Sequence, residues 1–191
     1  RGGSEALDSN TVIAQILSRA AEKAGLPPDV IQHVDQDLYS AYGVATEPGI
    51  GYRTNRQAVE QLQATLPEVS IHAFDLPHYK GKSDVFHLMS VLSPLDADLA
   101  CVYLPLMPVR LVQFLEARGI GFAEVPAEEF ESMGCNVLAL GPRHAMMVEG
   151  NPETERRMKA AGVKVEVIKG YDICRKGEGG PTCMTRPLVR G

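Results

Sequence analysis

The segment Leu115-Glu-Ala-Arg-Gly-Ile-Gly-Phe-Ala-Glu-Val125 resembles a later segment, Met158-Lys-Ala-Ala-Gly-Val-Lys-Val-Glu-Val167. In each segment a helical pattern ends at a glycine, Gly119 or Gly162, and a strand with alternating apolar residues follows. Glycine is common at the end of a helix because it adopts a left-handed backbone conformation without steric cost. The recurrence therefore predicts that the chain contains repeated units in which a helix leads into a strand.

Strand-like segments also occur in pairs before both of these helices. The pairs are Val85–Leu92 with Leu99–Leu104, and Asn136–Leu140 with Ala145–Val148. A looser third copy consists of a helix over Gln57–Leu66 that leads to the strand Val69–Phe74. The predicted unit is strand, strand, helix, strand, and such a unit cannot bury its apolar face alone. We therefore predict an α/β fold in which three modules pack around a common centre.

The composition excludes several classes of protein. The chain has 191 residues, of which 45% are hydrophobic and 23% are charged, as in soluble globular proteins. A net charge of −5 argues against nucleic acid as the main partner. The most apolar segment, Leu99–Leu115, contains two prolines and an arginine and is too short to cross a membrane. The four cysteines, at positions 101, 135, 174 and 183, lack metal-ligand spacing and favour a reducing, cytoplasmic location.

Two residues are candidates for chemistry. His87 lies in an apolar, strand-like segment, and Cys183 follows the glycine-rich segment Gly177–Gly180 and is expected to enter a strand. A thiol on a loop can meet a substrate, and a neighbouring histidine can lower its pKa or take its proton. Each residue also has an ordinary structural interpretation, as a hydrogen-bonded core histidine and a small buried cysteine. The spacing alone leaves both interpretations open.

Between about Gly49 and Arg190, the chain resembles the dimethylargininase and arginine deiminase group of guanidine-modifying enzymes, the pentein family. The matching stretches are Gly51–Asn55, Asp84–Ser90, Met133–Ala139, Glu149–Thr154 and Gly179–Leu188. The fold of that family is an α/β-propeller of five strand–strand–helix–strand modules. The resemblance thus implies a partial α/β-propeller, with about three of the five modules, over residues 38–191.

The resemblance also implies a reaction. The family's catalytic cysteine and histidine fall on Cys183 and His87. They would hydrolyse a guanidino compound, converting arginine or a methylarginine to citrulline and an amine through a thiouronium intermediate on the cysteine. Neither a metal nor an organic cofactor is implied. Arg53 matches the arginine that contacts the substrate carboxylate, and Asp35 is a weak candidate for the acid that orients the histidine, because the family's neighbouring glycines are missing.

The N-terminal region departs from this pattern. Residues 1–35 resemble a piece of gamma-glutamyl phosphate reductase, so we treat residues 1–37 as a helix–strand segment of separate origin. The chain begins with Arg1 and not Met, and we expect it to be a fragment or a join of two families. An amidinotransferase on the same intermediate and a non-catalytic, truncated propeller are the alternative functions. The expected partners are a small guanidino substrate and, at an uncovered sheet edge, further copies of the chain in a homo-oligomer; no nucleic acid or membrane partner is expected.

Overall fold

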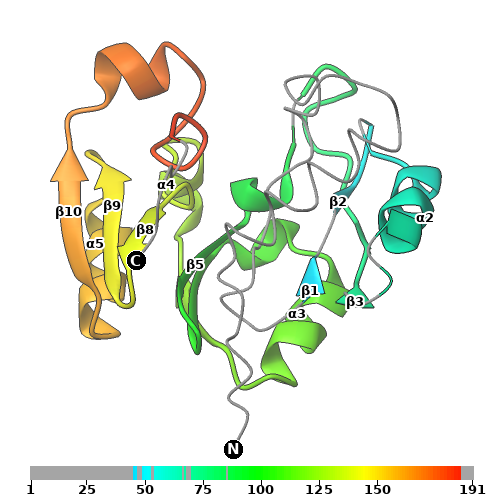
Figure 1. Cartoon of the computed structure of the whole chain (residues 1–191). Helices are drawn as coiled ribbons and strands as arrows, with labels where there is room; N and C mark the ends of the chain where they lie inside the picture. The colour runs from blue at the N-terminus through cyan, green and yellow to red at the C-terminus, as the bar shows by residue number, and fades with distance from the viewer. Residues whose placement is uncertain are drawn as a thin grey trace, which may run out of the picture.

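The computed structural model describes residues 45–46, 49–52, 54–65, 67, 70–84 and 86–185. Two three-stranded sheets contain most of the strand residues in the described part of the chain (Figure 1). The first consists of β5 (Leu92–Asp96), β6 (Leu99–Val102) and β7 (Gly121–Glu124), and the second of β8 (Leu138–Gly141), β9 (His144–Val148) and β10 (Lys164–Ile168). No helix within the described residues has the length and apolar character needed to span a membrane.

The two sheets have the same internal order. In each, the first two strands are antiparallel with a shift in register, and the third strand is parallel to the second. Parallel neighbours need a crossover connection, which α3 (Val109–Glu116) supplies in the first sheet and α5 (Pro152–Ala160) in the second. The predicted strand–strand–helix–strand unit is therefore confirmed in two copies, and the α/β class with it.

Equivalent glycines end the two crossover helices. Gly119 and Gly162 have φ angles of 73° and 84°, in the left-handed region where a side chain would be strained. In both copies the residue after the glycine donates its backbone N–H to the last buried residue of the helix, Ile120 to Leu115 and Val163 to Met158. The glycine thus turns each chain directly from the helix into the strand that follows it.

The third copy is smaller than the other two. The helix α2 (Arg56–Thr65) agrees with the prediction, and the Asn55 side chain caps it by accepting the N–H of Ala58 at 2.9 Å. The strands around it are only two residues long: β3 (Ser70–Ile71) pairs in parallel with β1 (Ala45–Thr46), and β4 (Phe74–Asp75) with β2 (Gly49–Ile50). As in the larger modules, a helix thus connects strands that pair in parallel.

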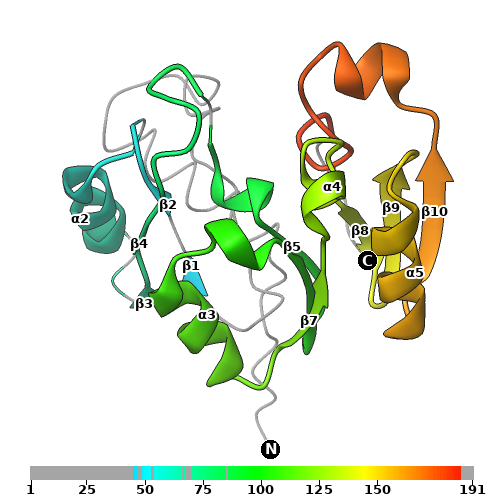
Figure 2. The same ribbon diagram turned by 180° about the vertical axis from the view of Figure 1, so that it is seen from behind.

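Two clusters of buried apolar side chains hold the modules together. One lies between the small unit and the first sheet and is centred on Phe74, Leu88, Leu92, Val102 and Leu111. The other lies between the first and second sheets and is centred on Leu95, Cys101, Cys135, Met147 and Met158. Figure 2 shows the small unit and the second sheet on opposite sides of β5–β7. The described chain is therefore a series of small sheets joined through apolar seams.

Arg143 connects the two larger modules at the edge of this second seam. Its guanidinium group forms ion pairs with Asp96, at 3.0 Å, and Asp98, at 2.6 Å, in the turn between β5 and β6. The same side chain donates to the backbone oxygen of Ala161 at 2.7 Å. Arg143 thus links the β5–β6 turn of the first large module to the C-terminal end of α5 in the second.

Two predicted strands differ from the structure: the one over Val85–Leu92 is wrong except at Leu92, and the one from Asn136 begins two residues late. Residues Leu88–Ser90 form a 3-10 helix and β5 begins only at Leu92, because the Ser90 hydroxyl and the His87 N–H close a turn at 3.2 Å. The strand predicted to begin at Asn136 begins at Leu138, because the Asn136 N–H bonds back to Met133 in another turn. In both places a local turn replaces the start of the predicted strand.

Candidate functional site

The four cysteines of the chain differ sharply in exposure. Cys101, Cys135 and Cys174 are buried, whereas Cys183 is exposed. Burial raises the pKa of the Cys135 thiol well above its ordinary value, which keeps this thiol protonated and unreactive at neutral pH. Cys183 is thus the cysteine that a substrate or reagent can reach without opening the core.

Cys183 sits in a turn over residues 181–184, and the expectation that it enters a strand is wrong. The Met184 N–H bonds to Gly180 at 3.0 Å and curls the chain around the thiol. Gly180 is required at this point, because a Cβ atom there would lie 2.5 Å from Oδ1 of Asn136. In both views of the fold, this loop lies beside α4 (Ala127–Phe130) and the residues that follow it (Figures 1 and 2).

Asn136 connects the body of the second module to the loop. Its Oδ1 atom accepts the backbone N–H of Thr182 at 3.1 Å, and its Nδ2 atom donates to Sγ of Cys183 at 2.8 Å. The Thr182 hydroxyl adds a bond to the backbone oxygen of Val137 at 2.7 Å. Sequence reasoning placed Asn136 inside a matching stretch but gave it no role, because its partners lie more than forty positions further along the chain.

Met89 brings a second segment to the thiol. Its Sδ atom lies 3.4 Å from Sγ of Cys183, although 94 positions separate the two residues. His87 precedes the same 3-10 helix in an extended conformation and is half-buried. The fold therefore brings the segment that carries His87 to the turn that carries Cys183.

The loop before His87 is fastened to the second module through Glu131. The Tyr79 hydroxyl donates to Oε1 of Glu131 at 2.6 Å, and the Lys80 ammonium group bonds to Oε2. These hydrogen bonds, that of Lys80 first, lower the pKa of Glu131 and keep it ionised at neutral pH. Between the loop and the first sheet, the rings of Tyr103 and Phe130 stack at 3.9 Å.

Glu129 is buried, unlike its exposed neighbours Glu128 and Glu131. Only 6% of its surface is exposed. Its carboxylate accepts the backbone N–H groups of Glu153 and Thr154, both at 2.8 Å, at the N-terminus of α5. Free N–H groups at a helix start favour a carboxylate, so Glu129 caps α5 from another helix.

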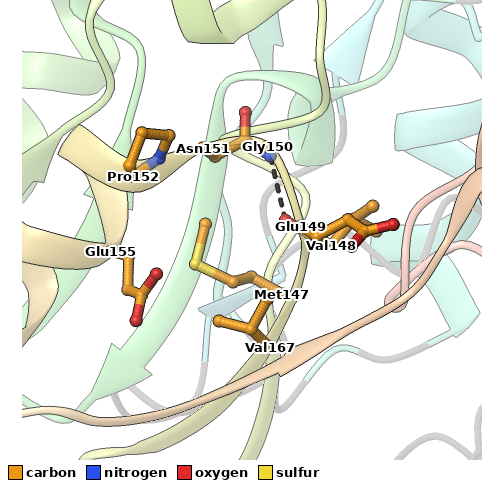
Figure 3. A pocket seen from close by; sticks show the side chains of 8 residues that line it. All are labelled: Met147, Val148, Glu149, Gly150, Asn151, Pro152, Glu155 and Val167. Carbon is orange, nitrogen blue, oxygen red and sulfur yellow. Dashed lines mark hydrogen bonds between the residues drawn. The ribbon is translucent and has the colours of Figure 1, made fainter.

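A small cavity of about 240 Å³ lies at the N-terminal end of α5 (Figure 3). It is lined by Met147, Val148, Glu149, Gly150, Asn151, Pro152, Glu155 and Val167. Asn151 closes one side by donating to the backbone oxygen of Val148 at 3.0 Å, the bond drawn in Figure 3. Neither Cys183 nor His87 belongs to its lining, so this cavity is separate from the candidate site.

The remaining candidates fall elsewhere. Asp35 and Arg53 lie outside the described residues. In the part of the chain that the structure describes, no group of three or more His, Cys, Asp or Glu side chains is arranged to hold a metal ion.

Comparison with known proteins places these features in a family. Residues 107–190, which include the second module and Cys183, match the family described as arginine deiminase. The uncharacterized protein YkgA of Bacillus subtilis is 30% identical over 143 residues, which cover 75% of this chain and 48% of that protein. The arginine deiminase of Mycobacterium marinum is 38% identical over 80 residues, or 41% of this chain and 20% of the relative.

Residues 107–190 of this chain thus match the arginine deiminase branch of the guanidine-modifying pentein enzymes. Three solved pentein structures share its fold. The N-terminal domain of the cyanobacterial arginine dihydrolase ArgZ superimposes with a TM-score of 0.69 at 17% identity, over 91% of this chain and 64% of that one. The amidinotransferase SxtG of Microseira wollei superimposes with a TM-score of 0.64 at 19% identity, over 83% of this chain and 49% of that one. DDAH of Pseudomonas aeruginosa in complex with citrulline superimposes with a TM-score of 0.56 at 23% identity, over 73% of this chain and 50% of that one.

The chain is shorter than these pentein relatives. It spans about half of YkgA and a fifth of the Mycobacterium marinum enzyme. The family match over residues 107–190 includes the second of the two larger modules and the cysteine loop.

Proposed function

We propose that this chain carries the cysteine and histidine of an enzyme that hydrolyses a guanidino compound, arginine or a methylarginine, to citrulline and an amine. Cys183 is the nucleophile and His87 moves the protons. The observation that carries the proposal is the 3.4 Å contact between Cys183 and Met89, which joins an exposed thiol to the segment of His87. The match to the pentein enzymes adds the expectation of guanidine chemistry.

The first half of the reaction forms a covalent intermediate. The Cys183 thiolate attacks the guanidinium carbon, and a carbon–sulfur bond forms as the C=N double bond becomes single. The carbon–nitrogen bond to the leaving group then breaks, and protonated His87 gives its proton to the departing amine. The product is an amine and a cationic thiouronium group attached to Sγ.

The second half restores the enzyme. His87, now neutral, takes a proton from a water molecule, whose oxygen attacks the thiouronium carbon. The carbon–sulfur bond breaks and Cys183 leaves as the thiolate. The new oxygen releases its remaining proton to solvent and becomes the ureido carbonyl of citrulline. His87 ends protonated, ready for the next turnover. No metal or organic cofactor enters the scheme, since the substrate carbon is already activated by the positive charge of the guanidinium group.

The proposal assigns further roles outside the described residues. Arg53 binds the substrate carboxylate, for which a guanidinium fork offers two parallel hydrogen bonds. Asp35 is the weaker proposal, as the acid that orients His87. We further propose that residues 38–191 are modules of an α/β-propeller and that residues 1–37 are a separate segment. The repeated sheet order and the pentein neighbours support the propeller.

An amidinotransferase is the second candidate, favoured by the fold shared with SxtG. In that reaction an amine, and not water, attacks the thiouronium carbon. The hydrolase and the transferase therefore differ only in the molecule that accepts the amidine carbon, which is water in the first and an amine in the second. A non-catalytic protein with the same fold is the third candidate.

Turnover assays distinguish these candidates. The chain is incubated with arginine or a methylarginine, and citrulline is measured in the wild type, Cys183→Ser and His87→Ala, with Cys174→Ser as a matched control at a buried cysteine. Hydrolysis predicts citrulline from the wild type and the control and none from the other two variants. Citrulline that survives Cys183→Ser would refute the nucleophile. Undiminished citrulline and no transfer product in the presence of an added amine acceptor would exclude the transferase. A wild type without citrulline or transfer product favours the non-catalytic protein.

A further inference from the structure

We propose that Asn136 is a positioning residue that orients Cys183 and stabilises its thiolate through the hydrogen bond from Nδ2. The inference rests on the proposed function, because it assigns Asn136 a part in preparing the nucleophile. It concerns a residue to which neither the sequence comparison nor the pairing of Cys183 with His87 gives a role.

The orientation of the Asn136 amide is fixed by its other partner. A backbone N–H can only donate, so the Thr182 N–H, 3.1 Å away, requires the amide oxygen of Asn136. The NH₂ group then points to Cys183, with Nδ2 2.8 Å from Sγ. An amide N–H is a donor only, and it binds a thiolate more strongly than a neutral thiol.

The surroundings show that this contact is built into the loop. Asn136 is only 9% exposed, and Gly180 lacks the side chain that would otherwise strike its amide group at 2.5 Å. The Thr182 hydroxyl holds the same loop independently, through Val137. Asn136 therefore holds the loop and also contacts Sγ of Cys183, whereas the Thr182 hydroxyl holds the loop through Val137.

The other charged groups near the thiol are common to all variants. The elements that meet the loop carry His87, before the 3-10 helix, and Glu178, in the loop itself. Glu129 and Glu131, on the segment before Asn136, are bound to α5 and to Lys80 respectively. A change in a variant at position 136 is thus due to the loss of the amide donor and, in an aspartate variant, to the added charge as well.

The test uses Asn136→Asp, which has the same shape and keeps an oxygen acceptor for the Thr182 N–H but replaces the donor with a negative charge. Thr182→Val is the control, because it removes the hydroxyl bond to Val137 and leaves the amide intact. Alkylation of Cys183 by iodoacetamide is followed by peptide mass spectrometry across a pH series. Thiolate absorbance in the ultraviolet provides a second readout, and thermal melts check folding.

We expect Asn136→Asp to move the midpoint of the Cys183 alkylation profile to higher pH by about one unit, a loss of about tenfold in rate at neutral pH. Thr182→Val should leave the midpoint where it is in the wild type. A profile of Asn136→Asp that coincides with the wild type would overturn the inference, and so would an equal shift in Thr182→Val. Asn136→Ala removes the donor without adding a charge and should shift the midpoint in the same direction. A wild-type midpoint in Asn136→Ala would assign the aspartate shift to its charge and would also overturn the inference.

The outcome is separable from that of the proposed function. Alkylation reads the thiol directly and needs no turnover. Turnover with an unchanged alkylation profile in Asn136→Asp would overturn the role of Asn136 and leave the hydrolase intact. A shifted profile without turnover in the wild type would support the contact and refute the hydrolase.

Discussion

Sγ of Cys183 and Sδ of Met89 lie 3.4 Å apart, although 94 positions separate the two residues in the sequence. Met89 belongs to the turn that opens the first large module, and Cys183 follows the last strand of the second. The contact therefore joins the two larger modules at the segment that carries His87. This relationship gives the two candidate residues a common neighbourhood and is the basis of the predictions below.

Gly180→Ala should displace the cysteine loop. The new Cβ would lie 2.5 Å from Oδ1 of Asn136, which forces the loop away from the amide that holds it. We expect the alkylation rate of Cys183, and any turnover, to change by about tenfold, since misplacement of a reacting group by about 1 Å can cost a hundredfold. Gly141→Ala is the control, because nothing lies within 4 Å of its added Cβ. Equal behaviour of the two variants would contradict the prediction.

Glu129→Ala should destabilise the fold. Its carboxylate is buried and accepts two backbone N–H groups of α5, which would lose their partners. We expect the free energy of unfolding to fall by about 1–3 kcal/mol, measured by urea denaturation. Glu128→Ala, at an exposed neighbour, should change it by less than about 0.5 kcal/mol. Comparable losses in both variants would show that the helix cap does not contribute.

The contact between Glu131 and the loop before His87 should depend on pH. Hydrogen bonds from Lys80 and Tyr79 lower the pKa of Glu131 below its ordinary value of 4.5 in the folded chain. The stabilisation is therefore present above 4.5 and is lost as the pH falls through the lower, folded-state pKa. Hydrogen exchange of residues 77–84 should be constant from neutral pH to about 5 and, corrected for intrinsic rates, accelerate below the folded-state pKa. Glu131→Gln should remove this acid-dependent step, and a step that persists in the variant would assign it to another group.

A cationic reagent should prefer Cys183 over the other cysteines and over a free thiol. Chloroacetamidine and chloroacetamide have the same shape and leaving group, but only the first carries the positive charge of a guanidinium group. The ratio of their rates at Cys183 should exceed the ratio for free cysteine, because a guanidine site favours the cation. Peptide mapping gives both rates at each of the four cysteines. A ratio at Cys183 equal to that of free cysteine would contradict a guanidine site.

The module could be predicted from the sequence because its signals are local. Gly119 and Gly162 end their helices and begin their strands within a few residues, so the pattern of apolar residues and glycines carries the information. At these two glycines the local backbone preference alone is enough to predict the end of the helix.

The parts that the sequence did not predict depend on distant contacts. Glu129 resembles its exposed neighbours in sequence, and only the start of α5, more than twenty positions away, explains its burial. The role proposed for Asn136 likewise depends on Thr182 and Cys183. The turn at His87 replaced a predicted strand because a single hydroxyl, that of Ser90, closes it. No periodicity in the sequence reports such bonds.

The most direct measurement of the central proposal is the identity of the residue that bonds to the substrate carbon. The chain is mixed with arginine or a methylarginine, quenched with acid during the reaction, digested and analysed by mass spectrometry. We predict an amidine-bearing adduct on the peptide that contains Cys183, absent from Cys183→Ser and present at unchanged position in Cys174→Ser. An adduct on any other cysteine, or citrulline formed with no adduct on Cys183 at any time point, would contradict the covalent mechanism.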